Sequence, residues 1–149
     1  MSTRLWHKDL IRALPDKLLL NQFRECGIIA SNIKKYNSPK SVYTNKIMCY
    51  NISEFSDYCK IVLEEIVNRR RKVSKRTIGT LKNTIGFDAN LQNINRDIYA
   101  GWHDLAYLIQ CYYMLEELRN CGEINNPDWY KILKQVQMIM ANATLSRKA

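Results

Sequence analysis

Apolar residues recur every three or four positions in four separate stretches of this 149-residue chain. That spacing is typical of helices that bury one face. We predict helices over about 15–28, 53–71 and 102–120, and a fourth from about residue 126 onward. Residues 73–101 show no steady period, so we expect an irregular segment there with at most one short helix. Only three prolines and five glycines occur, too few for an all-β fold with many tight turns.

The length fits one compact domain and leaves no room for a second substantial one. We therefore expect residues 1–149 to form a single all-α domain of about four helices with a long irregular loop. Hydrophobic residues make up 46% of the chain and charged residues 25%, which is an ordinary globular composition. No segment is apolar enough to span a bilayer and the N-terminus is too polar for a signal peptide. We expect a cytoplasmic monomer that does not bind membranes.

Local signals support individual helices. Asn51 and Glu54 form a capping box ahead of the second helix, and Cys121-Gly122 predicts the end of the third. The second helix has its buried face at Phe55, Tyr58, Cys59, Val62, Ile66 and Val67. The third groups on one side Leu105, Ala106, Ile109, Tyr112, Tyr113 and Glu116.

The charge of the chain points to a polyanionic partner. Lys and Arg number 23 against 14 Asp and Glu, which gives a formal net charge of +9. A surplus of this size favours nucleic acid as a partner. Six of the basic residues fall within eight positions, in the run Arg69-Arg70-Arg71-Lys72-Val73-Ser74-Lys75-Arg76. At a helix end, this run suits a phosphate backbone, although a solvated helix terminus would look the same.

The cysteines and histidines offer no metal site. Five cysteines occur with no Cys-x-x-Cys pair, and the only histidines are His7 and His103. We predict neither a metal nor another cofactor, and mostly buried, free thiols in a reducing compartment.

Two further groups are candidates for chemistry or binding. Glu25 lies beside Arg24 on a largely apolar helix, where a partly desolvated carboxyl suits proton transfer. The alternative is an Arg–Glu pair that only fixes helix packing. Trp129-Tyr130-Lys131 suits stacking on bases with a phosphate contact nearby. The alternative for this triplet is a Trp129 that packs in the core with Tyr130 at its rim.

The α-amino group is a further nucleophile, because its pKa of about 7.7–8.0 leaves much of it neutral at cellular pH. The residue after Met1 is small, which favours Met removal and a mature chain that begins at Ser2. A free amine there is able to attack a sugar C1′ and form a Schiff base.

Several of these residues together resemble the pyrimidine-dimer DNA glycosylase family, the phage endonuclease V-like enzymes and their bacterial relatives. The likeness lies in Thr3-Arg4-Leu5-Trp6-His7, Leu14-Pro15, Leu18-Leu19, Gln22 and Phe23-Arg24-Glu25-Cys26, and again in Pro127-Asp128-Trp129-Tyr130-Lys131. The segments Ile98-Tyr99, His103-Asp104, Tyr107-Leu108 and Cys111 are similar to the bacterial members.

The resemblance implies a compact all-α enzyme that acts on damaged double-stranded DNA. It implies cleavage of the glycosyl bond of a cyclobutane pyrimidine dimer by the N-terminal amine, followed by β-elimination 3′ to the lesion. Glu25 would assist the sugar chemistry, Arg4 and Arg24 would hold phosphates, and Trp129-Tyr130-Lys131 would support DNA binding.

This chain has one residue more ahead of Thr3 than the viral pattern. The catalytic amine therefore belongs to Ser2 if only Met1 is removed, or to Thr3 if Ser2 is removed as well. We predict that DNA is also bound by Arg69, Arg70, Arg71 and Lys72. Two other functions stay open: a DNA-binding relative without chemistry, and a glycosylase for another modified base.

Overall fold

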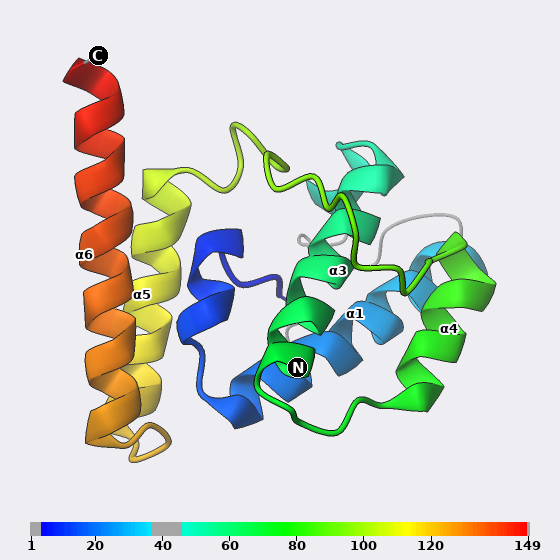
Figure 1. Ribbon diagram of the computed structural model, residues 1–149, viewed down its shortest axis with the longest axis horizontal. Helices are drawn as coiled ribbons and strands as arrows, with labels where there is room; N and C mark the ends of the chain where they lie inside the picture. The colour runs from blue at the N-terminus through cyan, green and yellow to red at the C-terminus, as the bar shows by residue number, and fades with distance from the viewer. Residues whose placement is uncertain (1–3, 37–45, 149) are drawn as a thin grey trace. The chain divides into compact units, whose positions relative to one another are not determined.

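The computed structural model describes residues 4–36 and 46–148, and residues 1–3, 37–45 and 149 lie outside the description. All regular secondary structure in the described ranges is helical, which confirms the all-α class. The described helices are the 3₁₀-helix η1 (Lys8–Ala13) and the α-helices α1 (Asp16–Tyr36), α3 (Ile52–Asn68), α4 (Lys75–Ile85), α5 (Leu105–Asn120) and α6 (Asn126–Lys148) (Figure 1). The described part thus holds these five α-helices and a further helical turn at residues 46–48, where the sequence predicts about four helices.

The chain groups into two compact units. The first contains Arg4, Leu5 and the residues from Lys17 to Tyr99, with α3, α4 and nearly all of α1. The second contains the residues from Trp6 to Asp16, with η1, and the chain from Ala100 onward, with α5 and α6. The assignment of residues 1–149 to one domain stays a prediction.

The first unit is built around the apolar faces of α1 and α3. On α3 the predicted stripe is buried as expected, except that Val67 is 48% exposed. Val67 is the next-to-last residue of α3, beyond Ile66, the last buried residue of the helix. On α1 the buried side includes Leu19, Phe23 and Cys26.

Helix α4 is the short helix for which the sequence left room in residues 73–101. It begins after Ser74, whose side chain accepts the N–H of Thr77, and it ends at Gly86 in the left-handed conformation, φ 67°. An added Cβ on Gly27 of α1 would lie 3.1 Å from Cγ2 of Thr77. The Lys34 ammonium donates to the carbonyl of Asn83 at 2.8 Å. These two contacts make α4 run parallel to the second half of α1.

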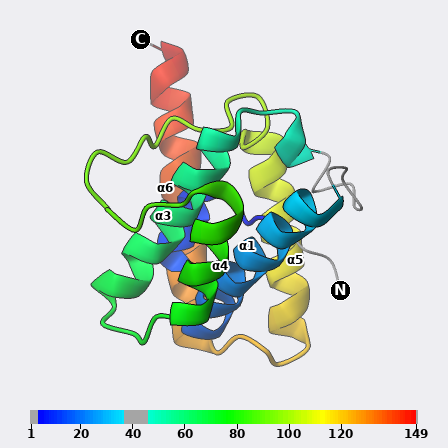
Figure 2. The ribbon, with the colours of Figure 1, turned by 90° about the vertical axis from the view of Figure 1, so that its right-hand side faces the viewer.

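The second unit is a helical hairpin with η1 against it. Helices α5 and α6 pack against each other and lie side by side in both views (Figure 2), while η1 packs on α6. The buried residues of α5 are Tyr107, Leu108, Cys111 and Leu115. This corrects the predicted face, because Ile109 and Tyr113 are exposed. Helix α5 carries apolar residues on more than one face, so the period of the sequence alone does not identify the buried face.

The helix ends follow the sequence signals. Asn51 caps α3 by accepting the N–H of Ser53, and α5 ends at Asn120, followed by Cys121 and by Gly122 at φ 81°. Glu54, the other residue of the predicted capping box, accepts the N–H of Tyr99 through its Oε1 at 3.0 Å. This long-range bond anchors the end of the irregular segment on the first turn of α3.

All five cysteines are free, and Cys26, Cys59 and Cys111 are buried, as expected. Among the described helices, none is long and apolar enough to cross a membrane.

Candidate active site

Glu25 lies in the middle of α1 and is half-buried. Its carboxylate accepts the backbone N–H of Arg4, and the charge of Arg24 acts on it as well. Burial raises the pKa of the Glu25 carboxyl above its usual value, while the Arg4 N–H and the Arg24 charge oppose part of that rise. A carboxyl whose proton is held closer to neutral pH is suited to general acid–base work.

Gln22, which the sequence did not single out as a site residue, holds the backbone carbonyl of Arg4. Gln22 Nε2 donates to this carbonyl at 2.9 Å, and Gln22 is buried. The hydroxyl of Tyr58 on α3 in turn donates to Gln22 Oε1 at 3.1 Å. One signal in the sequence was available: Gln22 is a polar residue on the inward face of α1, three positions before Glu25 and so on the same side of the helix.

Arg24 points to solvent from the other side of α1. It is exposed, and its Nη2 donates to Oδ1 of Asn21, one turn earlier. Arg24 is three positions before Gly27, which packs on the first turn of α4. Arg24 and Gly27 thus share one face of α1, and Lys75 and Arg76 at the start of α4 are exposed.

The predicted basic run begins where α3 ends, and its members differ in environment. Arg69 caps α3 and pairs through Nε with Oε2 of Glu65 at 2.8 Å, in a half-buried ion pair. Arg70 has a left-handed backbone, φ 56°, at the turn that follows. Arg70, Arg71 and Lys72 are exposed. Their exposure agrees with both interpretations of the basic run, a contact with DNA phosphates and a solvated helix end.

Comparison with known protein families shows the family to which the chain belongs. A family model described as pyrimidine dimer DNA glycosylase matches residues 3–78. The chain belongs to this family. Comparison with curated proteins gives no match, and comparison with solved structures gives none.

The stretch matched by the glycosylase family contains Arg4, Arg24, Glu25 and the basic run 69–72. The predicted nucleophiles at Ser2 and Thr3 lie outside the described residues, although Thr3 begins the matched stretch. The contact of Glu25 with Arg4 therefore joins the predicted acid to the first described residue of the chain.

The predicted triplet of the DNA-binding site lies in the second unit, at the start of α6. Trp129 is buried, with its ring 5.7 Å from that of Tyr112 and the Arg119 guanidinium 5.0 Å from its centroid. Tyr130 is 66% exposed and Lys131 is exposed. Core packing, the alternative considered for Trp129, is what the structure shows. Only Tyr130 and Lys131 are open to a ligand.

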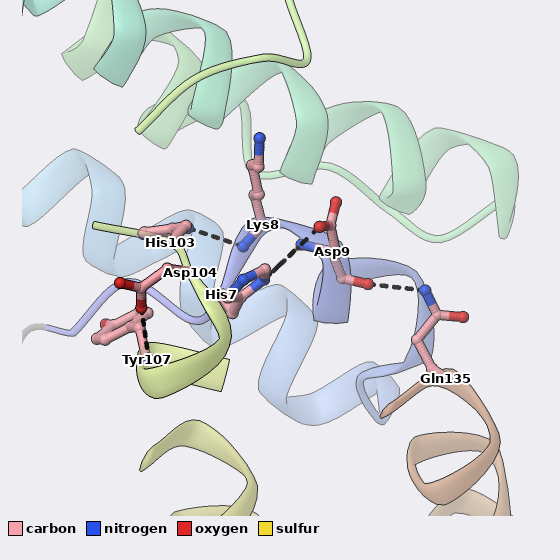
Figure 3. Close-up of polar contacts among 7 residues, drawn as sticks. All are labelled: His7, Lys8, Asp9, His103, Asp104, Tyr107 and Gln135. Carbon is pink, nitrogen blue, oxygen red and sulfur yellow. Dashed lines mark hydrogen bonds and ion pairs between the residues drawn. The ribbon is translucent and has the colours of Figure 1, made fainter. Parts of the chain in front are cut away.

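The two histidines form a second polar cluster, also in the second unit (Figure 3). The N–H of Lys8 donates to Nδ1 of His103 at 2.9 Å, and the N–H of Asp9 donates to Nδ1 of His7 at 3.1 Å. The His103 ring stacks on Tyr107 at 4.9 Å and lies 5.3 Å from the His7 ring. The Lys8 side chain points away from both rings (Figure 3). Both imidazoles thus serve as acceptors that fix the start of η1.

Burial keeps this pair neutral. It lowers the pKa of His103 to about 2, and the neighbouring His7 and Lys8 contribute to the fall. It also lowers the pKa of His7, against the opposing charge of Asp9. Within the described ranges, no three His, Cys, Asp or Glu side chains are placed to hold a metal ion.

Proposed function

We propose that this protein is a DNA glycosylase with AP-lyase activity that acts on cyclobutane pyrimidine dimers in duplex DNA. The observation that carries the proposal is the contact between the Glu25 carboxylate and the N–H of Arg4. Consecutive Cα atoms are about 3.8 Å apart, so an amine on Thr3 or Ser2 is tethered within one or two residues of that contact. Family membership supplies the lesion class.

The first step is attack by the α-amine. Its nitrogen bonds to C1′ of the lesion nucleotide while the glycosyl bond breaks and its electron pair leaves with the base. Loss of a proton from nitrogen and opening of the C1′–O4′ bond, with a proton delivered to O4′, give an imine at C1′. An α-amine suits this step because its pKa is about 7.7–8.0, well below that of a lysine.

The second step is β-elimination from the imine. A base removes a proton from C2′, a C2′–C3′ double bond forms, and the phosphate leaves C3′ with the electron pair of the C3′–O bond. Glu25 is suited to both proton transfers, as the acid that protonates O4′ and then, once ionised, as the base at C2′. Burial raises its pKa above the usual carboxyl value, in the direction that favours taking up and releasing a proton.

The charged residues provide the DNA contacts in this account. Arg24 directly precedes Glu25, and the backbone of Arg4 contacts the Glu25 carboxylate. The exposed Arg70, Arg71 and Lys72 lie on a turn that leads into α4. Tyr130 and Lys131 provide contacts from the second unit. Lesion enzymes extrude the damaged nucleotide while phosphate contacts hold the bent duplex, and such contacts need no sequence preference.

Borohydride trapping tests the activity. Duplexes that contain a dimer or an abasic site are incubated with the protein, and borohydride reduces any imine to a stable amine crosslink. We expect crosslinks and strand cleavage with both duplexes. Cleavage of abasic but not dimer duplexes would favour the alternative of a glycosylase for another modified base. Binding without any crosslink would favour a DNA-binding relative that lacks chemistry.

A further inference from the structure

We propose that Gln22 is a positioning residue that, together with Tyr58, fixes the backbone of Arg4 so that the amine ahead of it reaches the sugar. The inference rests on the proposed function, since it assigns Gln22 a role in amine catalysis. Gln22 touches neither the amine nor DNA in this account. It acts through the peptide groups of Arg4.

Both backbone groups of Arg4 are hydrogen-bonded to side chains of α1. Its carbonyl accepts from Gln22 Nε2 at 2.9 Å, and its N–H donates to the Glu25 carboxylate. Gln22 and Glu25 are one helical turn apart on α1, so both hydrogen bonds are set by one rigid helix. A single hydrogen bond would let this segment rotate about it, whereas two bonds, one to the carbonyl and one from the N–H, restrict both its position and its orientation.

The Arg4 carbonyl determines which end of the Gln22 amide faces it, because a carbonyl can only accept. The reversed amide would set two oxygens against each other at Arg4. The other end of the amide is held by Tyr58, whose hydroxyl donates to Gln22 Oε1 at 3.1 Å.

Burial gives these bonds their strength and their specificity. Gln22 is 1% exposed and Tyr58 is fully buried. A buried amide that loses its partners is expensive, so the arrangement is held in place. Tyr58 is itself fixed by packing, with its ring 6.1 Å from that of Tyr99, whose N–H is bound by Glu54. The chain of contacts from α3 through Gln22 thus ends at the backbone of Arg4.

Amine catalysis depends on such positioning because the nucleophile is carried by the chain end. A misplacement of about 1 Å lowers a rate by roughly 10²-fold when reacting groups must be aligned. A residue of this kind changes the rate of imine formation and leaves the affinity for DNA nearly constant, because phosphate contacts by other residues set that affinity.

The test is the single-turnover rate of borohydride trapping on an abasic duplex, with the dissociation constant for the same duplex measured in parallel. Gln22→Met keeps the length of the side chain and removes both hydrogen bonds. We expect its trapping rate to fall about 10- to 100-fold with little change in affinity. Tyr58→Phe removes the hydroxyl that holds Gln22 Oε1, and we expect a smaller fall in the trapping rate. It also serves as the test if Gln22→Met fails to fold.

Thr77→Val is the matched control. Thr77 is also buried in the first unit, and its hydroxyl donates to Oγ of Ser74 at 3.0 Å, away from Arg4. This variant should lose stability and keep the trapping rate of the wild-type protein. An equal loss in Thr77→Val would show that the rate follows general stability, and would overturn the proposal.

Gln22→Glu makes the hydrogen bond to the Arg4 carbonyl depend on pH. The ionised carboxylate still accepts from Tyr58 but cannot donate to the Arg4 carbonyl, whereas the protonated carboxyl can. The ratio of the variant's rate to the wild-type rate should therefore rise as pH falls, measured where circular dichroism shows both proteins fully folded. A constant ratio would contradict the proposal.

The outcomes separate the two claims. If the wild-type protein gives no crosslink, the proposed function fails, and the role of Gln22 fails with it. If the wild-type protein is trapped and folded Gln22→Met and Tyr58→Phe are trapped equally fast, amine catalysis stands and the positioning role is overturned.

Discussion

The backbone N–H of Lys8 donates to Nδ1 of His103 at 2.9 Å, although 95 residues separate the two in sequence. The bond requires an unprotonated Nδ1, so the start of η1 is held in place by a neutral imidazole. Nδ1 of His7 accepts the N–H of Asp9 in the same way, 3.1 Å away. The second unit therefore depends on two buried histidines that do not carry charge.

Stability should decline on mild acidification. An unfolded imidazole has a pKa of about 6.5, whereas that of His103 lies at about 2 in the folded protein. Between these values the unfolded state binds more protons, so stability is fully present above pH 6.5 and is lost as pH falls below it. Each such histidine contributes at most about 1.4 kcal/mol per pH unit. Guanidinium unfolding between pH 7.5 and 5 measures the slope.

His103→Phe separates this effect from the titration of the carboxylates. The variant should be less stable at pH 7.5 by about 1–3 kcal/mol, because the Lys8 N–H loses its acceptor. Its stability should then fall less steeply with acid, so the two curves converge. Parallel curves would show that His103 does not contribute to acid sensitivity.

Glu25→Gln should suppress trapping and strand cleavage by about 10²–10⁴-fold while DNA affinity changes little, since an amide keeps the shape but does not transfer protons. Glu64→Gln is the matched control, because Glu64 is also half-buried and pairs with Arg96 at 2.7 Å. It should cleave at the wild-type rate. Wild-type turnover by Glu25→Gln would leave only a role in helix packing for this carboxylate.

How much the sequence predicts depends on whether a feature is local. The cap at Asn51, the end of α5 at Gly122 and the half-buried Glu25 all follow from residues within one or two turns. Helix α4 begins after Ser74 and ends at Gly86, and residue periodicity did not reveal these bounds.

The missed features depend on contacts between distant residues. Glu54 accepts the N–H of Tyr99 at a separation of 45 residues. Gln22 is bound to Arg4 at a separation of 18 residues, and Tyr58 reaches Gln22 across 36. Such contacts exist only once the helices are packed, so no window of sequence shows them.

The basic turn should contribute to DNA affinity through its exposed members. Replacing Arg70 and Lys72 together by glutamine should lower the slope of log affinity against log salt by about 2. Arg69→Gln should lower it by less, because Glu65 already pairs with the Arg69 guanidinium. Titrations of a dimer-containing duplex at several salt concentrations give the slopes, with Lys82→Gln as a control for loss of charge elsewhere. An unchanged slope in the double variant would identify the turn as a solvated helix end.

Substitution of Trp129 should affect mainly stability, and substitution of its neighbour Tyr130 should affect mainly DNA binding. Trp129→Ala should lower the free energy of unfolding by about 3–5 kcal/mol, since it removes a buried ring that packs on Tyr112. Tyr130→Ala should change stability by less than about 0.5 kcal/mol, because the side chain is exposed. We expect this second variant to weaken duplex binding. Thermal unfolding and DNA titration of both variants compare the two roles, and a stable Trp129→Ala that fails to bind DNA would assign Trp129 to base stacking.

The measurement that tests the account most directly is peptide mapping of the borohydride crosslink. An imine contains the nitrogen that attacked C1′, so the crosslinked residue identifies the nucleophile. We predict the α-amino group of Ser2 after removal of Met1. Acetylation of that amine should abolish trapping and spare most binding, because it removes the lone pair and leaves the arginines intact. Deletion of Ser2 tests whether an amine on Thr3 reacts faster. A crosslink on Lys8, Lys17 or Lys131 would contradict the assignment of the amine, even in a protein that cleaves dimers.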